Sequence, residues 1–253
     1  RDSYIRNENP AEEDLKKSLR GAGLAEGMVL DRALLDQTIQ ELQKQYYAKG
    51  KYSVQITPEI TPLSDNRLGV KLKVSEGLSA KIQKINLIGN SAYSNRKLLG
   101  LLESNTGSWN PLNRNNIYSK QRFAGDLETL RSYYMNRGYL EFDIPTTQVE
   151  ISPDKKQVYL HIMVKEGDRF TFDEVAFDGD TLWPAEDLKK LVEFKKGEVF
   201  SRSAVIAAVN TITERYSDEG YAFVNVNAVP QVNAEKKTVG FTFFNLALKI
   251  VSV

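Results

Sequence analysis

The sequence contains no cysteine and one histidine, His161, among its 253 residues. Disulfide frameworks and thiolate metal sites are therefore excluded, and a lone histidine does not predict a metal site. The 34 basic and 33 acidic residues give a net charge of +1, so the sequence lacks the concentrated basic surface of a nucleic-acid binding protein. Its longest apolar stretches, such as residues 98–102, are far shorter than a membrane-spanning helix.

The sequence also lacks a pattern that predicts catalysis. On its predicted strand, His161 alternates away from Leu160 and Ile162, which directs its side chain off the core. Paired carboxylates, which fit solvated helix faces, occur at three places: Glu12 with Glu13, Asp126 with Glu128, and Asp218 with Glu219. No spacing selects two carboxylates that face each other across a cleft, and no glycine loop is suited to phosphate. We therefore expect no enzymatic activity and no cofactor.

A helix end followed by glycine and tyrosine occurs three times. The segments are Tyr46–Tyr52, Tyr133–Tyr139 and Arg215–Tyr221, and the glycines at 50, 138 and 220 lie 88 and 82 residues apart. This period predicts a tandem array of one small module. The sequence Val74–Gly77 returns as Val164–Gly167, so we predict domains at residues 1–77, 78–167 and 168–253.

Hydrophobic periodicity predicts an α+β module with the element order β-α-α-β-β. The middle repeat should contain strand 80–88, helices 95–103 and 119–136, and strands 139–151 and 157–166. The third repeat should contain strand 170–177, helices 185–193 and 201–218, and strands 221–232 and 238–244. The first repeat should contain helices 12–20 and 31–49 and strands 52–60 and 67–75, with its first strand missing.

Three features depart from a regular array. The middle repeat has an inserted loop at residues 109–116, a tolerated insertion or a partner contact anchored by Trp109. The tail, residues 245–253, is apolar and strand-prone, and we expect it to pair with a neighbouring sheet edge. Because the chain begins at Arg1 without methionine or signal peptide, we interpret it as a piece of a longer protein.

The middle repeat carries the most specific motifs. Residues Lys120–Tyr134, followed by Arg137-Gly138-Tyr139 and Thr147-Gln148-Val149, closely resemble the polypeptide-transport-associated (POTRA) domains of outer-membrane β-barrel assembly factors. The resemblance covers the chain to about Phe244, and by order the repeats would be a truncated second, a third and a fourth POTRA domain. It implies a three-stranded mixed sheet with the third strand central and two helices on one face.

The resemblance also implies a function, because an outer strand exposes unpaired backbone groups that accept another strand. We expect a periplasmic scaffold of a bacterial outer-membrane protein that captures unfolded outer-membrane proteins by strand addition. The expected further partners are a BamB-like lipoprotein and, in the full-length protein, a C-terminal membrane barrel. The predicted edge strand contributes these residues: Leu140, Glu141, Phe142, Asp143, Ile144, Val149 and Ile151.

Pro145 fits an edge position, and Pro58 and Pro230 occupy corresponding strands, so each binding segment should be short and each affinity weak. Alternatively, Pro145 protects the edge from unwanted pairing. Two other functions remain open: a POTRA array of a two-partner-secretion or related transporter, and a cell-wall hydrolase. We expect one stiff and one mobile joint between modules.

Overall fold

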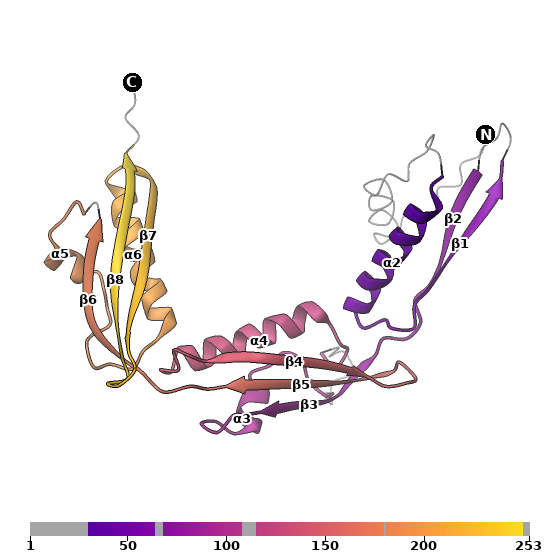
Figure 1. Cartoon of the computed structure of the whole chain (residues 1–253), viewed down its shortest axis with the longest axis horizontal. Helices are drawn as coiled ribbons and strands as arrows, with labels where there is room; N and C mark the ends of the chain where they lie inside the picture. Colours follow the sequence, from indigo (N-terminus) through magenta and orange to yellow (C-terminus); the bar gives the residue numbers. More distant parts are fainter. Residues whose placement is uncertain (1–29, 64–67, 108–114, 180, 250–253) are drawn as a thin grey trace. The chain divides into compact units, whose positions relative to one another are not determined.

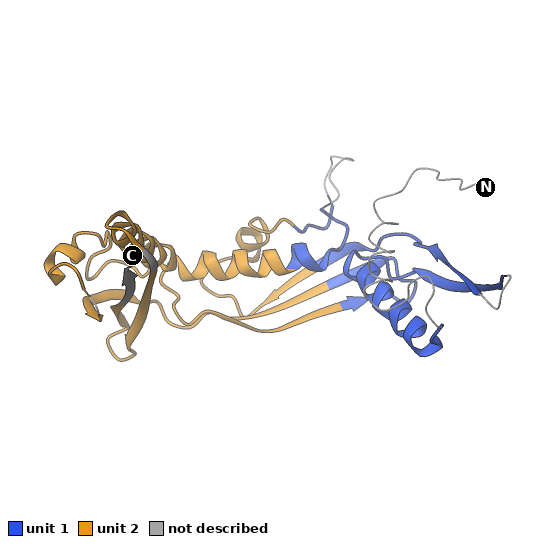
Figure 2. Ribbon diagram, turned by 90° about the horizontal axis from the view of Figure 1, so that it is seen from above, with its two compact units in different colours: residues 1–84, 104–123, 150–159 blue, residues 85–103, 124–149, 160–253 orange. Residues whose placement is uncertain are grey.

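The computed structural model describes residues 30–63, 68–107, 115–179 and 181–249 (Figure 1). The chain divides into two compact units: residues 1–84, 104–123 and 150–159, and residues 85–103, 124–149 and 160–253 (Figure 2). Both units contain part of residues 78–167, so the three-domain division stays a prediction. Within the described residues, none of the helices has the length and apolar character needed to cross a membrane.

The described part of the first repeat is one helix on a two-stranded sheet. Helix α2 (Arg32–Ala48) begins at Asp31, whose carboxylate accepts from the backbone N–H groups of Ala33 and Leu34. Strands β1 (Gln55–Pro62) and β2 (Leu68–Ser75) pair antiparallel. The core consists of Leu35, Ile39, Leu42, Val54 and Ile56. The helix predicted at 12–20 and the missing first strand lie outside the described residues.

The middle repeat follows the predicted order of elements. It comprises β3 (Lys81–Ile88), α3 (Asn95–Leu99), α4 (Lys120–Met135), β4 (Asp143–Ile151) and β5 (Gln157–Lys165). The order in the sheet is β3-β5-β4, which confirms the third strand as the central one. Strand β5 buries Val158, Leu160, Ile162 and Val164 on one face, whereas His161 is half-buried on the other face, as predicted.

The third repeat has the same topology in a mixed sheet. It comprises β6 (Thr171–Gly179), α5 (Ala185–Lys189), α6 (Arg202–Asp218), β7 (Tyr221–Asn233) and β8 (Thr238–Lys249). Central β8 runs parallel to β6 and antiparallel to β7. Aromatic residues fill the core, where Phe172 stacks on Phe194 with 3.8 Å between ring centroids. Ser201 begins α6 and accepts from the N–H of Ala204, as its position predicted.

The tail is extended, as predicted, through residue 249. Residues Asn245–Lys249 continue β8 and pair with the first half of β7, so their partner is a strand of their own sheet. Residues 250–253 lie outside the described part of the chain.

Three predicted boundaries were wrong by four residues. The first helices of the middle and third repeats end at Leu99 and Lys189, four residues earlier than predicted, and of the leucines at 98, 99, 101 and 102 only Leu98 is fully buried. The strand predicted from Tyr139 begins at Asp143. Bonds from the N–H of Leu140 to the carbonyl of Gly138 and from Phe142 to Tyr139 fold the intervening residues into turns.

Candidate functional site: the open edges of the sheets

One edge of each complete sheet is partly occupied by the chain itself. In the middle repeat, the N–H of Ile82 donates to the carbonyl of Asn116 at 2.7 Å, and that of Tyr118 to Ala80 at 3.0 Å. The third repeat repeats the arrangement, with Phe172 donating to Glu198 at 2.8 Å and Phe200 to Phe170 at 3.0 Å. The segment before each second helix therefore covers the start of β3 and of β6, and reduces their capacity to accept another strand.

The opposite edges are formed by β4 and β7. Each lies at the end of its sheet, and within the described ranges no strand pairs with its outer side. In β4, Asp143 and Ile151 are exposed, whereas Ile144 and Val149 are half-buried. These four members of the predicted site lie on one edge strand, as the sequence analysis required.

The other three predicted site residues precede the strand. Glu141 is exposed, but its Cβ lies 3.0 Å from the position that a Cβ on Gly167 would take. Phe142 is 3% exposed and stacks on Tyr134 at 4.2 Å, and Leu140 packs against the core of the third repeat. Their alternating pattern therefore reflects two packing contacts around a turn, and they do not belong to the open ladder. Trp109, the predicted loop contact, lies outside the described residues.

The repeated glycines connect each module to the next. The carbonyl of Gly50 accepts from the N–H of Ala80 at 2.8 Å, and that of Gly138 accepts from Phe170 at 2.7 Å. Both glycines have positive φ, 77° and 102°. A Cβ on Gly50 would lie 2.6 Å from the carbonyl oxygen of Tyr118, so both conformation and space require glycine here.

The family model described as surface antigen variable number repeat, or POTRA, matches three segments: residues 7–77, 80–167 and 170–244. The chain belongs to the POTRA family. Among curated proteins, the outer membrane protein assembly factor BamA of Neisseria meningitidis is 37% identical over 229 residues, which cover 90% of this chain and 29% of that protein. BamA of Buchnera aphidicola is 32% identical over 188 residues, covering 73% and 30%. The chain thus spans less than a third of either relative.

Solved structures agree with the fold. POTRA domains 3–5 of Haemophilus influenzae BamA align with a TM-score of 0.58 and 26% identity, covering 66% of this chain and 65% of theirs. BamA of Haemophilus ducreyi lacking POTRA domains 1–3 aligns with a TM-score of 0.53 over 66% of this chain and 29% of that one, and its 18% identity supports the fold alone. The α+β POTRA module predicted from the sequence is confirmed.

The joint between the middle and third POTRA repeats carries further bonds. Asn136, at the end of α4, accepts through Oδ1 from the N–H of Ser203 at 2.8 Å, in the first turn of α6. Arg202 pairs with Glu128 of α4 at 3.0 Å, and the Arg169 side chain donates to the carbonyl of Arg137 at 3.1 Å. One repeat therefore caps a helix of the next, which the sequence analysis did not find because Asn136 looks like part of its own helix end.

The boundary motif of the middle POTRA repeat, Val164–Gly167, contains a buried carboxylate. Glu166 is 9% exposed and accepts from four donors: Ser91 N–H (3.0 Å), Ser91 Oγ (2.6 Å), Ala92 N–H (3.1 Å) and the Tyr134 hydroxyl (2.7 Å). Burial raises the pKa of Glu166, but the hydrogen bonds from these donors lower it by more. The pKa therefore lies below the usual range of a glutamate. The equivalent Glu76 of the first repeat instead pairs with Lys51 at the surface.

One predicted solvated carboxylate is in fact structural. Asp126 of α4 is 3% exposed and accepts from the N–H of Glu103 at 2.7 Å. The carboxylate thereby satisfies a backbone donor of the segment that follows α3, which explains why an acidic residue is buried there. Its neighbour in the predicted pair, Glu128, lies at the surface and binds Arg202.

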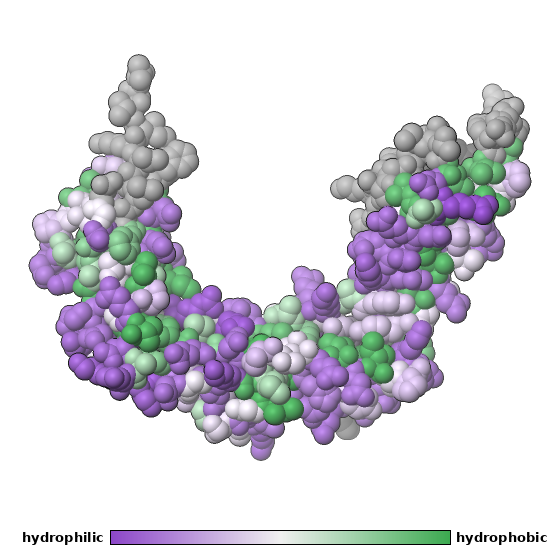
Figure 3. Space-filling model, viewed as in Figure 1, coloured by the Kyte–Doolittle hydropathy of each residue, from purple (hydrophilic) through white to green (hydrophobic). Residues whose placement is uncertain are grey.

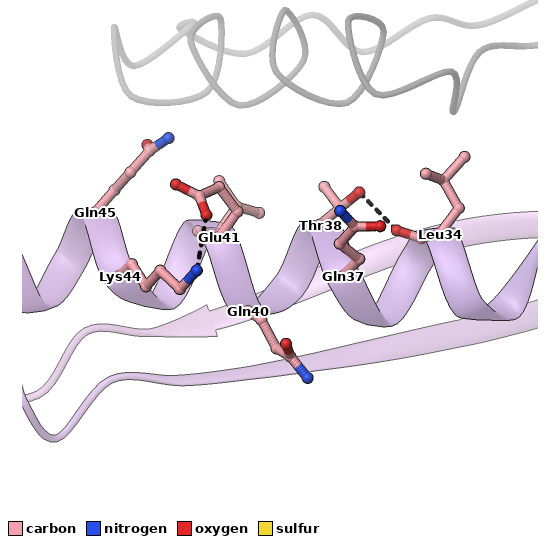
Figure 4. A pocket seen from close by; sticks show the side chains of 8 residues that line it. Leu34, Gln37, Thr38, Gln40, Glu41, Lys44 and Gln45 are labelled. Carbon is pink, nitrogen blue, oxygen red and sulfur yellow. Dashed lines mark hydrogen bonds and ion pairs between the residues drawn. The ribbon is translucent and has the colours of Figure 1, made fainter.

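A pocket among the described residues of the first repeat holds no arrangement of side chains that suggests catalysis. It runs along α2 and is lined by Leu34, Gln37, Thr38, Gln40, Glu41, Leu42, Lys44 and Gln45 (Figure 4). Lys44 pairs with Glu41 at 3.2 Å, and the Thr38 hydroxyl donates to the carbonyl of Leu34. Nor do the described residues contain a cluster of three side chains suited to a metal ion. The open sheet edges are therefore the candidate functional site.

Proposed function

We propose that the chain is the periplasmic part of an outer-membrane protein assembly factor and acts as a non-enzymatic scaffold. It captures unfolded outer-membrane proteins by adding one of their strands to an open POTRA sheet edge. The observation that carries this proposal is the difference between the two edges of each sheet: β3 and β6 are partly covered by the chain, whereas β4 and β7 are not. Backbone bonds at such an edge accept strands of many sequences.

The family relationship supports this setting. The relatives named above are outer membrane protein assembly factors, and this chain matches less than a third of each. A C-terminal membrane barrel in the full-length protein is part of the proposal. The alignment with POTRA domains 3–5 of BamA supports the assignment of the middle and third repeats as third and fourth POTRA domains. An accessory BamB-like lipoprotein is the proposed second partner, with Trp109 as a candidate contact.

The test is an NMR titration of the isotope-labelled chain with a peptide of about ten residues from an outer-membrane barrel strand. We expect progressive amide shifts along the edge strands, with smaller shifts on β3 and β6. A scrambled peptide of the same composition, which loses the alternation of apolar and polar residues, is the control. Shifts confined to the loop around Trp109, or no shifts, would contradict strand capture and leave the fragment as a docking spacer.

A further inference from the structure

The open edge strands differ in how strongly they are protected against pairing. Natural sheet edges avoid unwanted partners through charges, prolines and short length. Strand β1 has eight residues with Pro58, Pro62 and Glu59, and β4 has nine residues with Pro145, Asp143 and Glu150. Strand β7 is 13 residues long and, alone among the described strands, contains no charged residue.

Proline also interrupts β7 least. Its single proline, Pro230, lies near the C-terminal end, and the register with β8 shifts between Tyr221 and Phe223, which leaves residues 223–229 without interruption. That segment is shorter than the roughly nine to eleven residues of a transmembrane barrel strand, so it can pair with only part of one. In β4, by contrast, Pro145 is the third residue and the remaining free segment is shorter.

The register between β7 and β8 shows which backbone N–H groups of β7 point away from the sheet. Pro230 lies opposite Phe241 of β8 but has no N–H to donate, and proline is tolerated where that N–H would point away from the sheet. Because the direction alternates along a strand, Ala228, Val226 and Val224 also direct their N–H groups outward. These are the donors that an added strand would meet.

The side chains of β7 define the partner. Buried Val226 and half-buried Val224 and Ala228 alternate with exposed Asn225 and Asn227. On the asparagine face, Val229 is 37% exposed, and Phe244, opposite Asn227 in β8, is 41% exposed. Figure 3 shows apolar residues interspersed with polar ones over this sheet. An added strand continues this pattern when it is uncharged and alternates apolar with polar residues.

We infer that β7 of the third repeat, and not β4 of the middle repeat, is the principal docking edge for a client strand that is uncharged and alternates apolar with polar residues. This inference rests on the proposed function and assigns its main site. A charged client strand loses solvation against the neutral edge without gaining a partner charge, so uncharged strands are preferred.

Two proline variants separate the edges. The probe is a synthetic uncharged peptide of about ten residues that alternates valine with threonine or asparagine. Ala228→Pro removes an outward N–H from β7, and Thr147→Pro does the same in β4, two residues after Pro145. We expect Ala228→Pro to raise the peptide Kd about tenfold, since a lost backbone bond and a steric block act together, and Thr147→Pro to change it less than about twofold.

A second pair of variants distinguishes a local effect on peptide binding from misfolding of the chain. Asn227→Lys adds a charge to the open face of β7. Asn210→Lys makes the same change at an exposed position of α6. Only the first should weaken peptide binding, and in both variants the amide signals of the third repeat away from the substituted residue and its strand or helix neighbours should match those of the unmodified chain.

Each alternative outcome is decisive. Weaker binding in Thr147→Pro with Ala228→Pro unaffected would overturn the inference and keep the proposed function, with β4 as its site. Absence of peptide binding to the unmodified chain would overturn both. If sedimentation instead shows a dimer that Ala228→Pro abolishes, while the peptide does not bind, β7 pairs with a second copy of the chain and the client inference is wrong.

Discussion

Replacing Glu166 with alanine should destabilise the middle repeat, and the structure sets the size of the effect. The substitution removes the acceptor of the Tyr134 hydroxyl, which is fully buried and would be left without this bond. An unsatisfied buried donor costs about 1–3 kcal/mol, and a bond to a charged group contributes about 1.5–3 kcal/mol. The donors at Ser91 and Ala92 lie near the surface, where water replaces the carboxylate at lower cost. The expected loss is therefore about 2–4 kcal/mol.

The first repeat supplies the matched control. Glu76→Ala changes the same position of the same motif, but its partner Lys51 lies at the surface, where an ion pair contributes about 0–1 kcal/mol. Hydrogen exchange, read by mass spectrometry, reports each repeat separately: peptides from α4 and β5 report the effect of Glu166→Ala, and peptides from α2 and β2 report that of Glu76→Ala. Glu166→Ala should accelerate their exchange about 30- to 1000-fold, since 1.4 kcal/mol corresponds to a factor of ten. Equal effects of the two substitutions would refute the reasoning.

The same carboxylate predicts a pH dependence. The pKa of Glu166 is lower in the folded than in the unfolded protein, so its contribution is present above the unfolded value, about 4.3. The contribution is lost as the pH falls through the folded pKa. Glu166→Gln should therefore destabilise the middle repeat at pH 7 and differ less from the unmodified chain as the solution is acidified. A difference that stays constant from pH 7 to about pH 2 would contradict this assignment.

Three further substitutions, one of them with a matched control, test the joint at Gly138, the cap at Asn136 and the buried carboxylate of Asp126. Gly138→Ala should destabilise by about 1–3 kcal/mol in thermal unfolding because φ is 102° and the new Cβ would lie 2.6 Å from a side-chain atom, whereas Gly125→Ala, in open space on α4, should stabilise by up to about 1 kcal/mol. Asn136→Ala should cost about 1 kcal/mol and accelerate hydrogen exchange in the first turn of α6; an equal change throughout α4 would argue against a cap between repeats. Asp126→Ala should cost about 1–3 kcal/mol and free the segment after α3, seen as faster exchange at residue 103.

The sequence predicted features with a local cause. Positive-φ glycines after a helix, serine at a helix start and period-two alternation each report on their own segment, so helix α6 and the central strand β5 were placed within a residue or two. The edge position of β4 followed from Pro145 and from the family resemblance together. These are the parts of the fold for which neighbouring residues suffice.

Features that depend on distant residues were missed. Glu166 marked a module boundary in the sequence, but its donors Ser91 and Tyr134 are 75 and 32 residues away. Phe142 continued an apolar alternation and was placed in the strand, whereas contact with Tyr134 decides its position. Asp126 looked solvated because nothing near it in sequence indicates that Glu103 needs an acceptor.

The bonds made by Ala80 and Phe170 give the array a direction during folding. Each residue donates its N–H to the glycine of the preceding repeat and accepts, through its carbonyl, from its own repeat. The first strand of a repeat is therefore positioned by a helix end that was synthesised earlier. In arrays whose units interact with nearest neighbours, such a contact transmits order from one unit to the next. Damage to the middle repeat should consequently slow folding of the third repeat more than that of the first.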